Sequence, residues 1–276
     1  PPALVSRAAD ALAAALAARR AREPARLVGA VGGFRGYALA AAALEADTLV
    51  FTVTPDEASA RQLAADASFF LGVAARDTSD GPVLLISEIE TSPYADAAAD
   101  PRAVALRLAA LFRLVDPQAD PPVLVVASVH ALLRLAIPPR TFLGLCTRWS
   151  AGDELAREDA EAALQRAGYT RVDLVEDPGT YAVRGGVLDL FAGCSRFPVR
   201  LEFDGDVIER LRLFDPESQR SLREVSAAAI HPARETVATT ESPLRARVLA
   251  LADAALAPSS KSRQIVDNLE QGLEFF

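Results

Sequence analysis

The sequence contains few of the residues on which active sites and metal centres most often depend. Its 276 residues include two cysteines, two histidines and one lysine, and there is no methionine. Cys146 and Cys194 are too few and too far apart for a zinc site or a disulfide framework, so we expect free thiols in a reducing cytoplasm. His130 and His231 lie on or beside apolar runs, without neighbours that suggest a nucleophile or a metal ligand. We therefore predict that this chain has no catalytic residue, no metal site and no cofactor.

Long apolar runs and an excess of positive charge are missing as well. The Ala-rich N-terminal segment is interrupted by charged residues, so we expect neither a membrane span nor a signal peptide. A net charge of −8 argues against a general nucleic-acid-binding surface, so we expect a protein partner and a cytoplasmic location. The chain begins without methionine and ends on the apolar stretch Gly272 to Phe276, and we expect it to be a piece of a longer protein.

The pattern of apolar residues changes along the chain. In the first part, β-rich apolar runs alternate with helical stretches, which predicts a parallel sheet covered by helices. Later, from Arg171 to about Pro232, short strands joined by turns predict a smaller antiparallel sheet. The expected fold class is α/β with a smaller inserted α+β antiparallel-sheet domain. The parallel strands are expected near Leu27–Val31, Leu49–Val53, Val83–Ile86 and Val123–Ala127.

Helices are expected between these strands and at both ends of the chain. Ser150 to Asp153 are expected to cap a helix that runs to Ala167. The other helices are expected near Leu4–Arg22, Ala38–Leu44, Asp56–Leu71, Ala103–Leu114, Pro243–Ala257 and Lys261–Gln271.

Two arginines stand out on the predicted antiparallel sheet. The turn Asp177-Pro178-Gly179 predicts that strands start near Thr180, and Gly185-Gly186 suits a bulge or a close approach of another backbone. Arg184 lies beside these glycines and Arg200 on a later strand. An arginine held on a strand presents a planar fork of donors suited to a carboxylate on a partner. Alternatively, both arginines simply pair with Glu202, Asp189 or Asp206 on neighbouring strands.

The segment from Val172 to Leu222 contains the strings DPGTYAVRGGVLDLF and PVRLEFDGDVIERLRLFDPESQRSL. They resemble the second domain of the UvrB-homology module found in bacterial transcription-repair coupling factors (Mfd) and in UvrB. The resemblance implies a UvrA-binding domain in which Arg184 and Arg200 contact UvrA. The sequence departs from the coupling factors at Asp204, where they have an aromatic residue. The residues implied in partner binding are Arg184, Arg200, Gly185, Phe203, Asp204 and Arg196.

The glycine-rich residues 29–37 (GAVGGFRGY) lie where a P-loop is expected, after an apolar run and before a helical stretch. A working P-loop has the pattern G-x-x-x-x-G-K-[ST]. Counted from residue 29, this chain has Phe34 at the second glycine, Arg35 at the lysine and Gly36 at the hydroxyl residue that holds magnesium. The one lysine, Lys261, is far away in the sequence. We predict a relic turn that does not hydrolyse nucleotide.

Two interpretations of this loop remain open. The degenerate loop formed by Gly29, Gly32, Arg35 and Gly36 either only packs a helix on a strand or binds an anion weakly through free N–H groups and Arg35. A P-loop lost in this way resembles the coupling factors, whereas UvrB keeps the motif. UvrB also inserts a tyrosine-rich hairpin that grips damaged DNA, where this chain has only Glu90–Asp96.

The resemblance implies three domains and a recruitment function. Residues 1–148 are the degenerate P-loop (RecA-like) domain, residues 149–235 the UvrA-binding domain, and residues 236–276 a helical return toward the first domain. The implied module is not an enzyme and recruits nucleotide excision repair through UvrA. A C-terminal domain of the full-length protein masks its UvrA face, and RNA polymerase and DNA are contacted by parts absent here. The alternative is a divergent UvrB-like nucleotide-dependent helicase or ATPase, which predicts nucleotide binding at residues 29–36.

Overall fold

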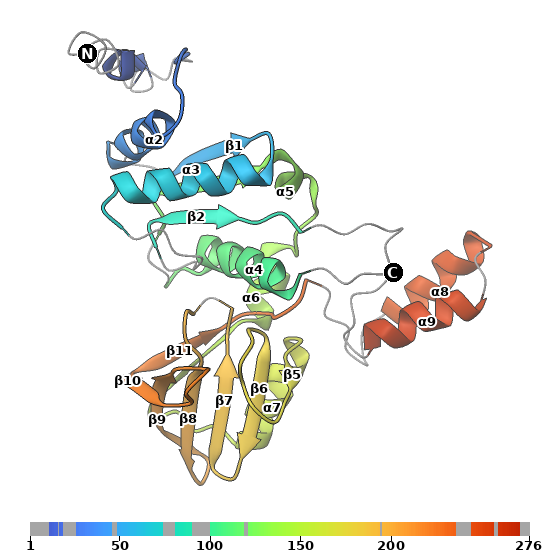
Figure 1. The fold of residues 1–276 in the computed structure, drawn as a ribbon. Helices are drawn as coiled ribbons and strands as arrows, with labels where there is room; N and C mark the ends of the chain where they lie inside the picture. Colours follow the sequence, from blue (N-terminus) through green and yellow to red (C-terminus); the bar gives the residue numbers. More distant parts are fainter. Residues whose placement is uncertain are drawn as a thin grey trace.

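The computed structural model describes residues 11–15, 17–18, 26–45, 49–73, 81–89, 100–118, 121–193, 195–235, 244–256 and 259–270. They form a helix-covered parallel sheet, a mostly antiparallel sheet and a helical hairpin (Figure 1). Cys194, the connection Glu90–Asp96 and much of the expected helix Leu4–Arg22 lie outside the described residues. The described part of that helix, residues 11–15 and 17–18, is helical. Within the described residues, no helix is long and apolar enough to cross a membrane.

The parallel sheet is built around one fully buried strand. Its three strands, β1 (Val50–Thr54), β2 (Val83–Ile86) and β3 (Leu124–Ser128), are ordered β1-β3-β2. Leu124 and Val126 of β3 pack toward α2 (Phe34–Leu44) and α3 (Glu57–Phe70), whereas Val125 and Ala127 pack toward α4 (Pro101–Val115). A strand covered on both faces packs apolar side chains in both directions, which explains the continuous apolar run from Leu124 to Ala127. Two short helices, α5 (Val129–Leu133) and α6 (Pro139–Leu145), follow.

Two expectations about local structure are wrong. Residues 26–31 form no strand, and Val28 and Val31 are 76% and 70% exposed. An apolar run becomes a strand only where a neighbouring strand accepts its hydrogen bonds, and the described residues provide none here. The helix after Ser150 is α7 (Arg157–Arg166), which starts later than expected. The carboxylate of Asp153 instead accepts the amide of Ser150 at 2.7 Å and closes a turn after β4 (Thr147–Ser150).

The second sheet has six strands in the order β10-β9-β8-β7-β6-β5, and only β5 and β6 are parallel. They are β5 (Thr170–Arg171), β6 (Thr180–Arg184), β7 (Val187–Phe191), β8 (Val199–Asp204), β9 (Val207–Phe214) and β10 (Ser221–Val225). One face carries the core, in which Ala160 and Leu164 of α7 pack among Tyr181, Leu188 and Leu201. This α/β fold with a separate, mostly antiparallel sheet confirms the predicted fold class.

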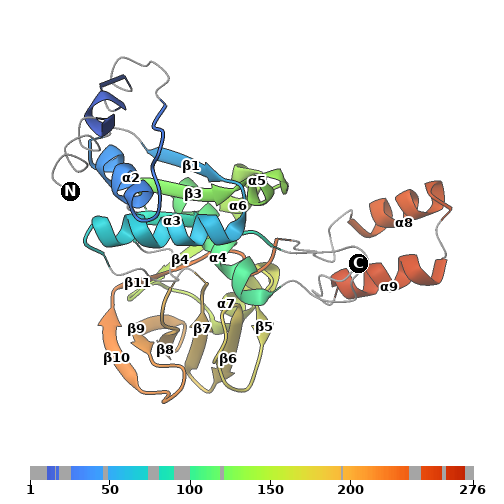
Figure 2. The same cartoon turned by 45° about the horizontal axis from the view of Figure 1, so that its top comes forward.

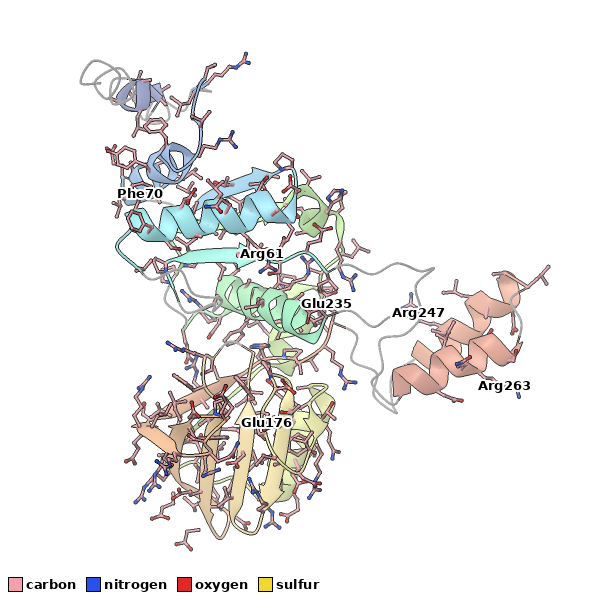
Figure 3. All side chains as sticks on the ribbon, viewed as in Figure 1. Arg61, Phe70, Glu176, Glu235, Arg247 and Arg263 are labelled. Atoms are coloured by element: carbon pink, nitrogen blue, oxygen red, sulfur yellow. The ribbon has the colours of Figure 1, made fainter. Side chains whose placement is uncertain are left out.

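The two sheets meet along α4, which lies between them in Figures 1 and 2. Strand β11 (Ala227–Ile230) pairs with β4 and leads the chain back to this junction. A β-carbon at Gly193 would lie 2.9 Å from the β-carbon of Ala105 in α4, so the backbones approach closely. Arg107 of α4 is buried and donates to Glu235 at 2.7 Å and to the carbonyl of Ala131 at 2.8 Å. Figure 3 shows Glu235 beside α4.

His231 is also buried at this junction, next to the ring of Phe112 with 5.5 Å between ring centroids. Its Nδ1 lies 2.7 Å from the carbonyl oxygen of Pro232, so Nδ1 carries the proton and donates it. Burial lowers the pKa of His231 to about 4. This histidine is therefore neutral at pH 7 and has a structural environment, as the sequence suggested.

The last two helices, α8 (Leu244–Ala254) and α9 (Ser259–Glu270), confirm the two helices expected at the end of the chain. They pack against each other and stand apart from both sheets, as Figures 1 and 2 show from two directions. The predicted domain boundaries at 148/149 and 235/236 stay predictions.

Candidate partner-binding surface

Tight turns hold the strands of the antiparallel sheet in register. Gly179, Gly185 and Gly205 take positive φ angles of 82°, 59° and 59°, which glycine adopts without strain. The pair Gly185-Gly186 forms the turn between β6 and β7 and is not a bulge. The expected close backbone approach is present, because the amide of Phe203 donates to the Gly186 carbonyl at 2.8 Å. The turns therefore fix which residues of β6, β7 and β8 lie opposite one another.

The face of the sheet opposite α7 carries two rows of aligned residues, which we call the arginine face. The first row crosses the sheet from β6 to β10 and consists of Ala182, Asp189, Arg200, Arg212 and Glu224. The second row consists of Arg184, Val187, Glu202 and Arg210. Four arginines and three carboxylates thus lie close together on neighbouring strands, which gives this face a different character from the apolar core face.

Asp189 joins the two arginines that the sequence singled out. Arg200 donates from Nε to Oδ1 at 2.7 Å and from Nη2 to Oδ2 at 2.9 Å. Arg184 donates from Nη2 to the same Oδ2 at 3.1 Å. Asp189 is only 1% exposed, whereas the side chains of Arg200 and Arg184 are 21% and 54% exposed. The pairing with neighbouring carboxylates that the sequence left as an alternative is therefore present, and it leaves both arginine side chains partly exposed.

Arg200 is fixed from two sides. Its guanidinium carbon lies 4.7 Å from the centroid of the buried Phe214 ring, and Asp189 holds its edge through two parallel hydrogen bonds. The hydrogen bonds with Asp189 raise the pKa of Arg200 above its ordinary value, against the opposing effect of partial burial. Arg200 is therefore a permanently charged, oriented donor.

The remaining ion pairs of the arginine face are more exposed. Glu202 lies 3.2 Å from Arg212 and 3.8 Å from Arg210, and Arg210 lies 3.5 Å from Glu224. Such surface pairs contribute only about 0 to 1 kcal/mol each. Sequence reasoning named neither Arg210 nor Arg212. The alternation of charged and apolar residues along β9 was the signal that could have placed them beside Arg200.

The other predicted partner-binding residues lie in different places. Asp204 is exposed at the end of β8, and Gly185 accepts a hydrogen bond from Arg157 at its carbonyl. Phe203 packs against the core on the opposite face. Arg196 lies in the loop at the other end of β7, 5.0 Å from the ring centroid of Phe197. The structure thus brings Arg184 and Arg200 together but does not bring Phe203 or Arg196 to them.

The glycine-rich loop has a different geometry. Gly29 and Gly32 take positive φ angles, and α2 begins at Phe34, four residues before the start expected at Ala38. The Nε of Arg35 donates to the carbonyl of Ala30 at 2.9 Å, so this side chain bonds its own loop. The amides of Phe34 and Arg35 donate to the carbonyls of Val31 and Gly32. These N–H donors are thus already bonded to carbonyl groups of the loop itself.

Gly36, the position of the P-loop hydroxyl residue, has no room for a side chain. A β-carbon there would overlap the β-carbon of Asp66 and lie 2.9 Å from the amide nitrogen of Ala67. Both belong to α3, which packs directly on α2. The residues present therefore do not fit a magnesium-bound nucleotide. Within the described part of the chain, no group of three or more His, Cys, Asp or Glu side chains is placed to hold a metal ion.

Comparison with known proteins gives one family model and several relatives. The model described as the UvrB interaction domain matches residues 148–235. The transcription-repair-coupling factor of Myxococcus xanthus is 40% identical over 262 residues, which are 93% of this chain and 21% of that protein. The factor of Escherichia coli (strain K12) is 34% identical over 186 residues, which are 67% of this chain and 15% of that protein.

A more distant similarity is found to the UvrABC system protein B of Natronomonas pharaonis. It is 40% identical over 111 residues, which are 40% of this chain and 16% of that protein. The chain spans about a fifth of the length of the first of these relatives. Homology to a part of the transcription-repair coupling factors is thus shown for nearly the whole chain, with the UvrB proteins as more distant homologues.

Proposed function

We propose that this chain, a homologue of part of the transcription-repair coupling factors, is a non-catalytic recruitment module. Its arginine face binds UvrA and so brings nucleotide excision repair to a stalled RNA polymerase. The observation that carries the proposal is the pair Arg184 and Arg200, oriented by one buried carboxylate on the segment that matches the UvrB interaction domain. The domain boundaries given above, at 148/149 and 235/236, are part of the same proposal.

The chemistry of the arginine face suits a partner that presents carboxylates. Among the described residues, Nε and Nη1 of Arg184 have no partner, so this side chain retains donors for another protein. Arginine is enriched at the centres of interfaces because its planar fork bonds carboxylates in two places. A sheet also docks with less loss of conformational freedom than a loop.

A non-catalytic role is supported by the glycine-rich loop. Phe34, Arg35 and Gly36 replace the three residues that a P-loop uses to bind phosphate and magnesium. Packing of α2 on α3 leaves no space for a hydroxyl side chain at position 36. In the full-length protein, we expect a C-terminal domain to mask the arginine face and other parts to contact RNA polymerase and DNA.

The proposal is tested by calorimetry of the whole chain with UvrA from the same organism. We expect Arg184→Ala and Arg200→Ala each to weaken binding at least tenfold, because loss of a buried interfacial arginine costs about 2 to 5 kcal/mol. Arg171→Ala is the matched control, since Arg171 is an exposed arginine on β5, paired with Glu161. The proposal fails if the chain does not bind UvrA, or if binding survives both substitutions unchanged.

A further inference from the structure

We infer that Asp189 is a positioning residue of the partner-binding site, which acts by ordering Arg184 and Arg200 before the partner arrives. This inference rests on the proposed function and assigns to Asp189 a role that neither the sequence strings nor the family match provides. Asp189 itself is 1% exposed, so a partner does not reach its carboxylate directly. Its effect on binding must pass through the two arginines.

The carboxylate of Asp189 restricts both arginines at once. It accepts three N–H groups, two from Arg200 and one from Arg184, and Oδ2 is shared between them. The two Nη2 atoms therefore lie within about 6 Å of each other, a separation that a single carboxylate of a partner can bridge. Arg200 is held further by the Phe214 ring. For the exposed Arg184, Asp189 is the described contact that fixes its direction.

Ordering the two arginine side chains before binding should increase the affinity by a measurable factor. A long side chain that is mobile in the free protein loses rotamer freedom when an interface forms, and this loss weakens the complex. Holding two arginines in place beforehand is worth about fivefold to a hundredfold in affinity. The gain appears mainly as slower dissociation, because most affinity differences within one interface lie in koff.

The charge of Asp189 has the opposite effect. Two arginines and one carboxylate carry a net charge of +1, so removal of the carboxylate makes this group more positive. If Asp189 acted only through its charge, its removal would strengthen binding to an acidic partner and accelerate association. If it acts by positioning, its removal weakens binding through faster dissociation. The two explanations thus predict opposite changes in affinity.

The experiment compares the whole chain with its Asp189→Asn variant in binding kinetics on immobilised UvrA, at low and at physiological salt. We expect koff to rise about tenfold, while kon stays equal or rises with a steeper dependence on salt. A general loss of structure would not raise kon. Glu209→Gln is the matched control, because it makes the same change of charge on an exposed side chain of β9 that lies outside both rows of the arginine face. We expect its koff to stay at the wild-type value.

A second measurement does not depend on the folding of a variant. In the unbound wild-type chain, the arginine side-chain N–H signals report which guanidinium groups are already ordered. We expect the Nε–H of Arg200 to be rigid and slow to exchange with water, in contrast to that of the exposed Arg171. Equal mobility of Arg200 and Arg171 in the free protein would overturn the inference.

The outcomes separate this inference from the proposed function. If Arg184→Ala and Arg200→Ala weaken binding while Asp189→Asn binds as tightly as wild type or more tightly, the positioning role is wrong and the function stands. If the arginine substitutions have no effect, the proposed function itself fails. Weaker binding of Asp189→Asn through faster dissociation, with kon equal or higher, supports both.

Discussion

The glycine-rich loop and the arginine face are made of similar residues but are organised differently. Each contains arginine together with at least one glycine that takes a positive φ angle. Arg35 bonds the carbonyl of its own loop, whereas Arg184 and Arg200 bond a buried carboxylate from another strand. On the sheet, a buried carboxylate fixes the direction of two arginine side chains, whereas the arginine of the loop is held only by a backbone carbonyl among the described residues. Residue type alone therefore does not predict how an arginine near glycines is held.

The junction between the two sheets tests whether the arginine face depends on the first sheet. Glu235→Ala leaves the buried Arg107 without its counter-charge, so we expect a loss of about 3 kcal/mol in the free energy of unfolding. Urea denaturation measures this loss, with Glu209→Ala on the exposed side of β9 as the control. UvrA affinity should stay unchanged, because Glu235 lies near α4 and away from the arginine face. A large fall in affinity would show that the two regions are coupled.

The same junction should make stability depend on pH. The unfolded chain protonates His231 below its ordinary pKa of 6.5, whereas the folded chain resists protonation down to about pH 4. The contribution of His231 to the free energy of unfolding is therefore fully present above pH 6.5. It falls by about 3 kcal/mol as the pH is lowered to 4. Chemical denaturation at several pH values, compared between wild type and His231→Phe, isolates this contribution. Identical pH profiles for the two proteins would contradict it.

At the glycine-rich loop, stability should be sensitive to an alanine substitution at one glycine and tolerant of the same substitution at another. Gly36→Ala forces a β-carbon into α3, and we expect a loss of about 1 to 3 kcal/mol in stability. Gly33→Ala serves as the matched control, since its β-carbon would meet only the ring of Phe70 at 3.9 Å. Thermal unfolding of both variants distinguishes them. Equal stability would mean that α2 and α3 do not pack as closely as described.

The exposed pairs at the edge of the arginine face should matter least. Glu224→Gln removes one partner of Arg210 on a side chain that is largely exposed, so stability should change by less than about 0.5 kcal/mol. Differential denaturation against wild type is sufficient to detect a larger change. A loss of stability comparable with that of Glu235→Ala would show that the exposed ion pairs of the arginine face contribute as much as the buried pair of the junction.

Local signals in the sequence predicted much of the antiparallel sheet. The turn at Asp177-Pro178-Gly179 was recognised because turn geometry depends on a few adjacent residues. The strand expected at residues 27–31 was wrong because a strand requires a distant partner, which composition does not reveal. The helix start after Ser150 was misplaced because Asp153 closes a turn in place of capping a helix.

The site was only partly predictable for a similar reason. Arg184 and Arg200 could be named from the motif, but their sharing of Asp189 depends on the register of three strands, over separations of 5 and 11 residues. The position of Phe203 could have been predicted from alternation. It lies three residues after Arg200, and residues an odd number apart on a strand point to opposite faces.

The most direct test of the account is amide hydrogen exchange of the chain with and without UvrA, compared between the two regions. The account predicts that UvrA protects the strands and turns around Arg184 and Arg200, and that exchange in residues 29–36 is unaffected. Protection confined to the glycine-rich loop, with no change on the arginine face, would contradict it.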